Sequence, residues 1–426
     1  MTNNQWLMAN VKINRALFLL AFLIILARGF LFTGAMPVVH YVLLAGKIAL
    51  IPIAIILALR TSGRPTAIDL CMLLYYVVMC VCCLLNSTPI LSVTLMALDV
   101  FIFWAMCRWF FARSSLFPLK VTTCFLLAFI AVNFLLMLWR PEGLWHYATN
   151  GKMYYLLGGN YNNMGKALLI AMVSNILLLR FIPRPTAPAS SIFEPYIFYR
   201  LTFALTIILS YGTLLIVGSK TSLLGITLLL AFSVLLLFRS KWLRITCLSL
   251  FIVLYFGFQS WTVFHNLDTS LPKTEYFIQH VLHKDLTFTL RTNIWTRSKQ
   301  LIERRPAIGY GEHDDMWYQL ELEGLTTHNL VLHILLKGGW LTLCAFILLL
   351  IVLHLLLLIR GPNTTPIAAD LTFFILAALW VYLFMMIVEV YPFFSLAILF
   401  IYAGYTIPPA FQPVDRTSDS ENKGCC

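Results

Sequence analysis

The chain has 426 residues, of which 60% are hydrophobic and only 11% are charged. Roughly a quarter of the residues in soluble domains are charged, so this composition excludes an ordinary soluble enzyme. The net charge of +12 would suggest a nucleic-acid partner in a soluble protein, but in a membrane protein most basic residues mark the cytoplasmic side. We therefore expect an all-α integral membrane protein that contacts membrane lipids and binds no nucleic acid.

Apolar runs of about twenty residues recur along the chain, and each can cross a hydrocarbon core of roughly 30 Å as a helix. The first run is longer than a signal-peptide core and no small-x-small cleavage site comes after it, so we expect it to remain as the first helix. About twelve transmembrane helices are predicted. Their approximate ranges are 13–32, 37–60, 67–86, 90–111, 119–139, 163–182, 200–218, 221–238, 243–262, 339–359, 370–388 and 393–411.

The basic residues decide how these helices are oriented. With the N-terminus in the cytoplasm, the short loops on the opposite side hold only Arg140, Lys152 and Lys220. Short cytoplasmic loops are enriched in Lys and Arg, so this orientation is favoured and both termini are predicted to be cytoplasmic. The basic residues on the cytoplasmic side are Lys12, Arg15, Arg60, Arg64, Arg108, Arg113, Lys120, Arg180, Arg184, Arg200, Arg239, Lys241, Arg244, Arg360, Arg416 and Lys423.

Two longer connections fall on the outer side, residues 140–162 and residues 263–338. Long ordered loops often carry function. In the second, Asn293–Arg304 has apolar residues at helical spacing between basic ones, which predicts an amphipathic helix that Pro306 and the turn Gly309–Gly311 end. The predicted organisation is helices one to nine in 1–262, an outer loop in 263–338, helices ten to twelve in 339–411 and a cytoplasmic tail in 412–426.

Several charged residues fall within or next to the predicted membrane helices. A charge there is costly, so we expect it to have a partner or a function. Arg28 and Glu389 lie near the outer ends of their runs, where they either extend to the interface or face a cavity. Lys47 and Asp99 lie deeper and form either one structural ion pair or part of a cavity lining. The remaining two are Lys166 and Lys220.

The outward turn Gly218–Ser222 places Lys220 and several backbone amides at the start of a helix. A helix start suits an anion, although a lysine here can also reach lipid headgroups. On the longer outer loop, Arg291 precedes the amphipathic helix, and His328 stands just before the chain re-enters the membrane. We expect Lys220, Arg291 and His328 to converge on one outward cavity.

These residue types fit the transfer of a sugar from a lipid diphosphate. Lys220 and Arg291 could neutralise the diphosphate, the arginine through a forked contact that a lysine cannot make. His328 could take the proton of an attacking hydroxyl, because histidine titrates near neutral pH. Asn329 could orient the histidine or hold a sugar hydroxyl, or it could cap the following helix.

Amides and aromatics on the outer segment 140–162 and its end add candidate sugar contacts, although aromatics at an interface are also plain membrane anchors. The chain there runs from Trp145-His146-Tyr147 to Gly158-Gly159-Asn160-Tyr161-Asn162-Asn163. The candidate substrate-binding residues are Arg28, Lys47, Asp99, Asn160, Asn163, Lys166, Arg305 and Asn329.

We predict neither a metal nor another cofactor. His313, Asp314, Asp315 and His333 are metal-ligand types, but no two of them share a convincing helical face. Eight of the ten cysteines fall within apolar runs and the other two end the chain, a pattern without zinc or disulfide spacing.

Four motifs between Gly218 and Gly339 together resemble the O-antigen ligase and polymerase superfamily of bacterial inner membranes, which includes Wzy-type polymerases and WaaL-type ligases. Each motif alone is weak, but their order and spacing are fairly specific. The motifs are Ser219–Leu224, Arg291–Trp295, Arg305–Gly311, and His328–Asn329 followed by Gly338–Gly339.

The resemblance implies a GT-C-like fold and a metal-independent glycosyltransferase that uses an undecaprenyl-diphosphate-linked oligosaccharide at the periplasmic face of the inner membrane. It implies that Arg291 contacts the donor diphosphate and that His328 is the base for the acceptor hydroxyl. Lys220 stands where family members often carry arginine, which keeps the charge but loses the forked contact.

Two acceptors are compatible with this resemblance. A polymerase passes the glycan to a second lipid-linked repeat unit, whereas a ligase passes it to lipid A-core. The Ser-Lys-Thr-Ser turn and the Arg-Pro-x-x-Gly-Tyr-Gly stretch are more similar to polymerases, so we favour a polymerase with a ligase as the alternative. A flippase of lipid-linked glycans is a further alternative, but transporters are typically built from repeats and the two halves of this chain show no similarity.

Overall fold

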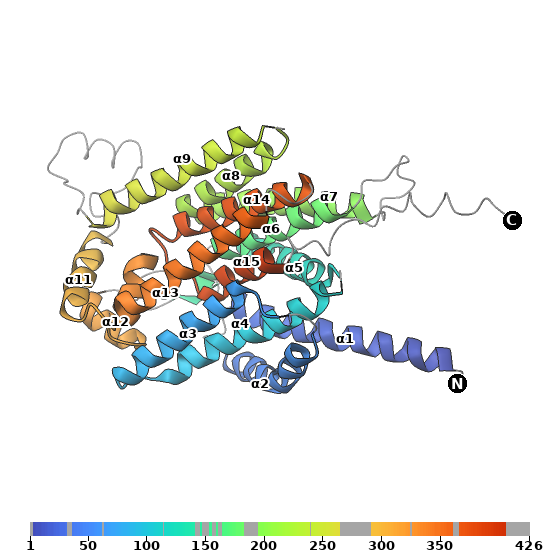
Figure 1. Ribbon diagram of the computed structural model, residues 1–426, viewed down its shortest axis with the longest axis horizontal. Helices are drawn as coiled ribbons and strands as arrows, with labels where there is room; N and C mark the ends of the chain where they lie inside the picture. The colour runs from blue at the N-terminus through green and yellow to red at the C-terminus, as the bar shows by residue number, and fades with distance from the viewer. Residues whose placement is uncertain are drawn as a thin grey trace.

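Helices make up almost all of the structure, a computed structural model of the chain (Figure 1). The residues that the structure describes are 3–31, 36–61, 64–113, 115–140, 145–146, 153–155, 159–160, 164–182, 195–238, 240–264, 291–323, 326–360 and 366–405. The first five helices are α1 (Asn3–Phe30), α2 (Pro37–Arg60), α3 (Ala67–Leu85), α4 (Ile90–Phe111) and α5 (Phe117–Trp139). After a small sheet come α6 (Met164–Phe181), α7 (Pro195–Val217), α8 (Lys220–Leu235), α9 (Lys241–Gln259) and the π-helical turn η2 (Ser260–Phe264). The last five helices are α11 (Arg291–Arg304), α12 (Asp315–Leu322), α13 (Leu330–Arg360), α14 (Pro366–Met385) and α15 (Phe393–Tyr405).

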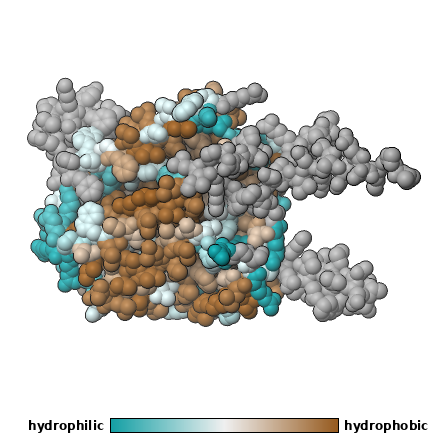
Figure 2. Space-filling view, in the orientation of Figure 1, coloured by the Kyte–Doolittle hydropathy of each residue, from teal (hydrophilic) through white to brown (hydrophobic). Residues whose placement is uncertain are grey.

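Eight of these helices are long and apolar enough to cross a membrane, namely α2, α3, α4, α5, α6, α7, α9 and α13. Four shorter helices or helix segments are also apolar, and they belong to α1, α8, α14 and α15. Every predicted apolar run overlaps one of these helices. Hydrophobic side chains cover the middle of the face in Figure 2, whereas hydrophilic ones gather at its left and right edges. The apolar helices confirm the prediction of an all-α integral membrane protein.

The outer segment between α5 and α6 departs from the all-helical prediction. It contains three short strands, β1 (Trp145–His146), β2 (Met153–Tyr155) and β3 (Gly159–Asn160). They form one antiparallel sheet in the order β1-β2-β3. Strands of two or three residues are too short for an alternating pattern to reveal them in the sequence.

Helix α6 forms the centre of the bundle. All of its side chains from Met164 to Leu178 are buried, and it packs against α5, α7, α8, α14 and α15. At its start, Gly165 leaves no room for a side chain, because a Cβ there would lie 2.2 Å from the Ser222 Oγ of α8. The first turns of α6 and α8 therefore touch at the same end of the bundle.

The predicted amphipathic helix is confirmed as α11. Ile294, Trp295, Leu301 and Ile302 are buried along one side of it, as the spacing predicts. The short helix α12 comes next and was not predicted. Its first turn is capped by Asp314, whose Oδ1 accepts a hydrogen bond of 2.9 Å from the Trp317 backbone N–H.

Helix α13 begins at Leu330, nine residues before the predicted start, and it is interrupted at Gly339, with φ 60° and ψ −162°. Such a break leaves backbone groups unpaired, which is costly in a membrane. The turn after α11 supplies their partners. Trp340 and Leu341 donate to the carbonyls of Pro306 and Ala307 at 2.8 and 3.1 Å, and Tyr310 and Gly311 donate to those of Leu336 and Lys337 at 2.8 Å each.

The Arg305–Gly311 and Gly338–Gly339 motifs are therefore the two sides of one backbone contact. A Cβ at Gly339 would lie 2.3 Å from the Ala307 carbonyl carbon, and one at Gly309 would lie 2.5 Å from the Leu336 carbonyl oxygen. Both glycines have positive φ, where other residues are strained. Through this contact the turn after α11 is fixed to the first third of α13.

Gly339→Ala is expected to lower the free energy of unfolding by more than about 2 kcal/mol, because its backbone conformation is nearly exclusive to glycine and the neighbouring backbone must move. Thermal unfolding of the purified protein in detergent measures this loss. The matched control is Gly257→Ala on α9, where an added Cβ meets nothing within 4 Å and alanine favours a helix by about 1 kcal/mol. Equal melting temperatures for the two variants would contradict the backbone contact.

Candidate functional site

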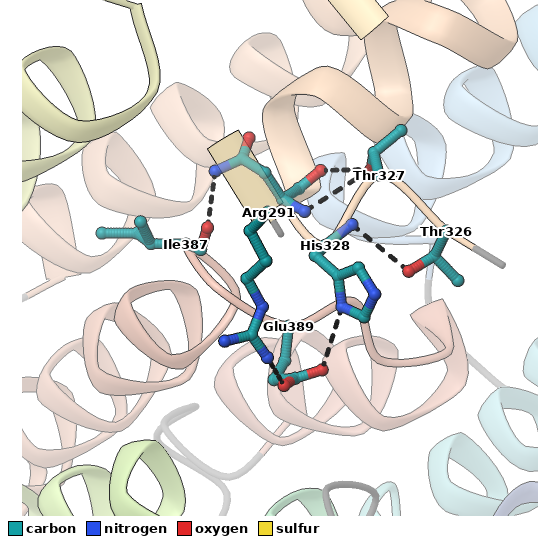
Figure 3. A network of polar contacts seen from close by, with 7 residues as sticks. Arg291, Thr326, Thr327, His328, Ile387 and Glu389 are labelled. Carbon is teal, nitrogen blue, oxygen red and sulfur yellow. Dashed lines mark hydrogen bonds and ion pairs between the residues drawn. The ribbon is translucent and has the colours of Figure 1, made fainter. Parts of the chain in front are cut away.

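Three polar side chains from three distant segments meet at one end of the bundle (Figure 3). Arg291 begins α11, His328 precedes α13, and Glu389 lies between α14 and α15. The Arg291 Nη2 forms an ion pair with the Glu389 Oε1, and the His328 Nδ1 lies 3.5 Å from the Glu389 Oε2. The side chains of Arg291, His328 and Glu389 are 13%, 21% and 11% exposed. One largely buried carboxylate therefore bridges a guanidinium and an imidazole.

The backbone around His328 is strained. His328 has φ 50°, a left-handed conformation that costs a non-glycine residue roughly 1–2 kcal/mol. Its N–H donates to the Thr326 Oγ1 at 3.2 Å, and the Thr327 hydroxyl donates to the Asn329 carbonyl at 2.9 Å. Strained residues of this kind concentrate at functional sites, where the surrounding contacts hold them in place.

Asn329 ties the start of α13 to the segment that carries Glu389. It is fully buried, and its Oδ1 caps α13 by accepting from the Leu332 N–H at 3.0 Å. Its Nδ2 donates to the Ile387 carbonyl at 2.9 Å and to the Gln259 Oε1 at 3.1 Å. These contacts agree with the prediction that Asn329 caps the following helix. They also hold the backbone next to His328 close to the segment that carries Glu389.

The Gly218–Ser222 turn lies beside the same segment. Gly218 has φ 69°, α8 starts at the exposed Lys220, and the Ser219 hydroxyl donates to the Ser222 Oγ at 3.0 Å. Burial and the nearby Glu389 raise the pKa of the Tyr391 phenol, while Ser222 and Arg291 act in the opposite direction. Tyr391 is thus near Ser222 at the start of α8 and near the Arg291–Glu389 pair, so the Gly218–Ser222 turn adjoins the site.

A second group of charges joins α1, α2 and α4. The predicted contact between Lys47 and Asp99 is present, with 3.2 Å between Nζ and Oδ1, and Lys47 also donates to the Leu95 carbonyl at 2.9 Å. The Arg28 Nη2 lies 4.0 Å from the Asp99 Oδ2. Arg28 therefore turns toward this pair, and two cations share one carboxylate.

Lys166 is a buried cation of a different kind. Its residue is 6% exposed, and its Nζ lies 6.0 Å from the centre of the Phe30 ring, within the range of a cation–π contact. Among the described residues, no carboxylate forms an ion pair with it. Its position next to Gly165 places it one residue from the α6–α8 contact.

The other candidate residues lie apart from the three-residue cluster or outside the described positions. The exposed Arg305 donates to the Asn86 Oδ1 at 2.7 Å and stacks over the Tyr310 ring, which holds the turn after α11 against the α3–α4 connection. Asn160 belongs to β3, and Asn163 lies outside the described residues. The His313 ring stacks on Trp317 at 4.3 Å between ring centres.

The pairing of Glu389 was not predicted from the sequence, which marks this residue only as a charge near a helix end. Its partners Arg291 and His328 lie 98 and 61 positions earlier in the chain, and no local periodicity links residues so far apart. The available signal was a single acidic residue in an otherwise apolar connection between two apolar runs, Val388-Glu389-Val390-Tyr391.

The apolar helices and the polar cluster at one end define an integral membrane protein of the all-α class with a polar site at one end of its bundle. Residues 205–347 match a family model, Wzy_C, described as O-Antigen ligase. The resemblance to the O-antigen ligase and polymerase superfamily is thereby confirmed over this part of the chain, which contains Lys220, Arg291 and His328. A comparison with curated proteins found no match.

A double-mutant cycle on Arg291→Gln and Glu389→Gln tests the bridge. Each single change leaves a largely buried charge without its partner, so the double variant is expected to be more stable than the sum of the single losses predicts, with a coupling of about 1–3 kcal/mol. Urea or thermal unfolding in detergent measures it. The control cycle pairs Arg291→Gln with Glu321→Gln on α12, and it should be additive within about 0.5 kcal/mol. Additivity in both cycles would contradict the observed pairing.

Proposed function

We propose that the protein is a glycosyltransferase that uses a lipid-diphosphate-linked oligosaccharide at the periplasmic face of the bacterial inner membrane and polymerises repeat units. The family match over residues 205–347 supports the enzyme class. The observation that carries the proposal is the Glu389 carboxylate that bridges Arg291 and His328. Such a transfer needs a base held in position and a cation beside it. In this cluster the Glu389 carboxylate orients the His328 imidazole, and Arg291 is the cation.

The proposed topology has twelve membrane-crossing helices in a GT-C-like arrangement, with both termini in the cytoplasm. The eight long and four shorter apolar helices support the helix number. The distribution of basic residues supports the orientation, which puts the His328 end of the bundle outside. Undecaprenyl diphosphate is the donor carrier that the superfamily implies for this side of the membrane.

In the proposed reaction His328 is the general base. Its Nδ1 faces the Glu389 carboxylate, which favours the tautomer with the proton on Nδ1 and leaves Nε2 to accept a proton. The acceptor hydroxyl loses its proton to Nε2 as its oxygen bonds to the anomeric carbon. The bond from that carbon to the diphosphate breaks, and the lipid diphosphate leaves with the electron pair.

Lys220 and Arg291 are the proposed ligands of the diphosphate. An arginine has five N–H donors, so the contact of Nη2 with Glu389 leaves others for phosphate oxygens. Lys220 adds a positive charge at the start of α8, where the backbone N–H groups also favour an anion. No step in this scheme uses a metal.

The acceptor separates the two candidate activities. The Ser219–Ser222 turn and the Arg305–Gly311 stretch support a polymerase, which joins one lipid-linked repeat unit to another. The matched family model is described as O-Antigen ligase, which supports transfer to lipid A-core as the second candidate. Both activities use the same donor chemistry, so the proposed roles of Lys220, Arg291 and His328 are common to them.

His328→Ala is expected to lower glycosyl transfer by about 100-fold or more, the usual contribution of a general base. Purified wild type and variant receive a lipid-diphosphate-linked repeat unit in liposomes, with and without lipid A-core, and products are resolved on a gel. His313→Ala is the matched control, because that ring stacks on Trp317 and has no proposed role.

A ladder from repeat units alone supports a polymerase, and a product that requires lipid A-core supports the ligase. Equal activity of the wild type and His328→Ala would refute the proposed base. Movement of the lipid across the bilayer without a new glycosidic bond would identify a flippase instead.

Glu389→Gln is expected to lower kcat by roughly 10-fold or more, as for partners that orient a catalytic group, with a smaller change in KM. Lys220→Met should mainly raise KM, because it removes a contact to the donor. Initial rates over a range of donor concentrations separate the two effects, and Glu389→Asp should recover part of kcat. The assignment of Glu389 as a positioning residue fails if its substitution changes KM alone.

A further inference from the structure

An apolar crevice of about 310 Å³ runs between α3 and α4, which pack against each other (Figure 1). Its walls include Leu73, Tyr76, Ala97, Leu98 and Trp104. It is separate from the Arg291–Glu389–His328 cluster, with which it shares no residue. A cavity of roughly 150 Å³ lined by apolar side chains can take up benzene, so this one has room for a stretch of hydrocarbon chain.

The crevice opens toward the side of the bundle that faces lipid. Leu70 and Leu73 are 56% and 60% exposed at its edge. On α4 its walls extend from Thr94 to Trp104, about 15 Å along the helix axis. This stretch is the middle of α4 (Ile90–Phe111), and its length is half of a hydrocarbon core of roughly 30 Å.

The crevice reaches the end of the bundle opposite to the candidate site. The other ends of α3 and α4 meet the turn after α11, where Gly311 packs against Thr88 and Arg305 contacts Asn86. Pro65 and Trp104 line the crevice near the start of α3 and toward the end of α4. The crevice therefore reaches the end of the bundle opposite to the candidate site at Pro65.

Arginines gather at this end, where α2 ends, α3 begins and α4 ends. Arg60, Arg64 and Arg113 are exposed, and Arg108 lies over the Trp104 ring with 5.2 Å to its centre. The single acidic residue among the crevice-lining residues, Asp69, is already engaged. Its carboxylate accepts from the Trp104 Nε1 at 2.8 Å, the Tyr405 hydroxyl at 2.5 Å and the Thr66 N–H at 2.6 Å.

We propose that this crevice binds one acyl chain of an anionic phospholipid whose phosphate lies against Arg64 and its neighbouring arginines. The apolar walls of the crevice favour a hydrocarbon chain. Basic residues beside a membrane attract anionic headgroups. Phospholipid of the adjacent leaflet fits better than the polyprenyl tail of the donor, because the crevice starts at the arginine end and the candidate site lies at the other. The lipid joins α3 to α4 and does not take part in the transfer.

The purified full chain in detergent is titrated with phosphatidylglycerol or with phosphatidylcholine, and bound lipid is counted by native mass spectrometry. Phosphatidylglycerol is expected to bind the wild type more tightly. Arg64→Glu should weaken that binding roughly tenfold, and Ala97→Phe should abolish it by filling the crevice. The controls are Lys241→Glu and Leu254→Phe, an exposed lysine and an exposed leucine on α9, and both should bind as the wild type does.

The Ala97→Phe variant is used only if its melting temperature in lipid-free detergent equals that of the wild type, which shows that it is folded. If its melting temperature is lower, Leu98→Phe is used in its place. Equal binding of the two phospholipids, unchanged by Arg64→Glu, would overturn the headgroup contact. If a polyprenyl phosphate displaces phosphatidylglycerol and Ala97→Phe raises the KM for the donor, the crevice holds the substrate tail and the proposal is wrong.

Discussion

The Glu389 carboxylate holds together segments that the chain brings from three different places. In an apolar bundle a buried carboxylate needs a cation and hydrogen-bond donors, because desolvation otherwise outweighs any gain from folding. Arg291 supplies the cation and His328 lies at the other oxygen. The position of α11 relative to the membrane helices therefore depends on an electrostatic contact at its first residue as well as on its apolar face.

Backbone hydrogen bonding determines where this contact can form. The break of α13 at Gly339 exposes carbonyl and N–H groups that the turn after α11 pairs, and Asn329 caps the start of the same helix while it holds the Ile387 carbonyl. In both places, backbone N–H and C=O groups find hydrogen-bond partners within the protein, as polar backbone groups at membrane depth must. Together they fix α11, the His328 turn and the Glu389 segment as one unit.

Hydropathy and periodicity predicted much of this fold because the bilayer imposes the length of each run and the amphipathic spacing marks α11. The contact between Lys47 and Asp99 was accessible for a similar reason, since two opposite charges at similar depth need each other. The early start of α13 was hidden, because Lys337 and the Gly338–Gly339 pair interrupt the apolar sequence, and glycine pairs usually mark the boundary of a helix. The pairing of Glu389 was hidden because it is a tertiary contact without a local signature.

The shared carboxylate couples two parts of the proposed reaction. Arg291 and His328 both rely on Glu389, so a diphosphate that draws the guanidinium toward itself leaves more of the carboxylate's charge facing the imidazole. A carboxylate that faces a histidine stabilises the imidazolium that forms when the base takes a proton. In the proposed reaction, the leaving group at Arg291 and the base at His328 are therefore linked through one carboxylate.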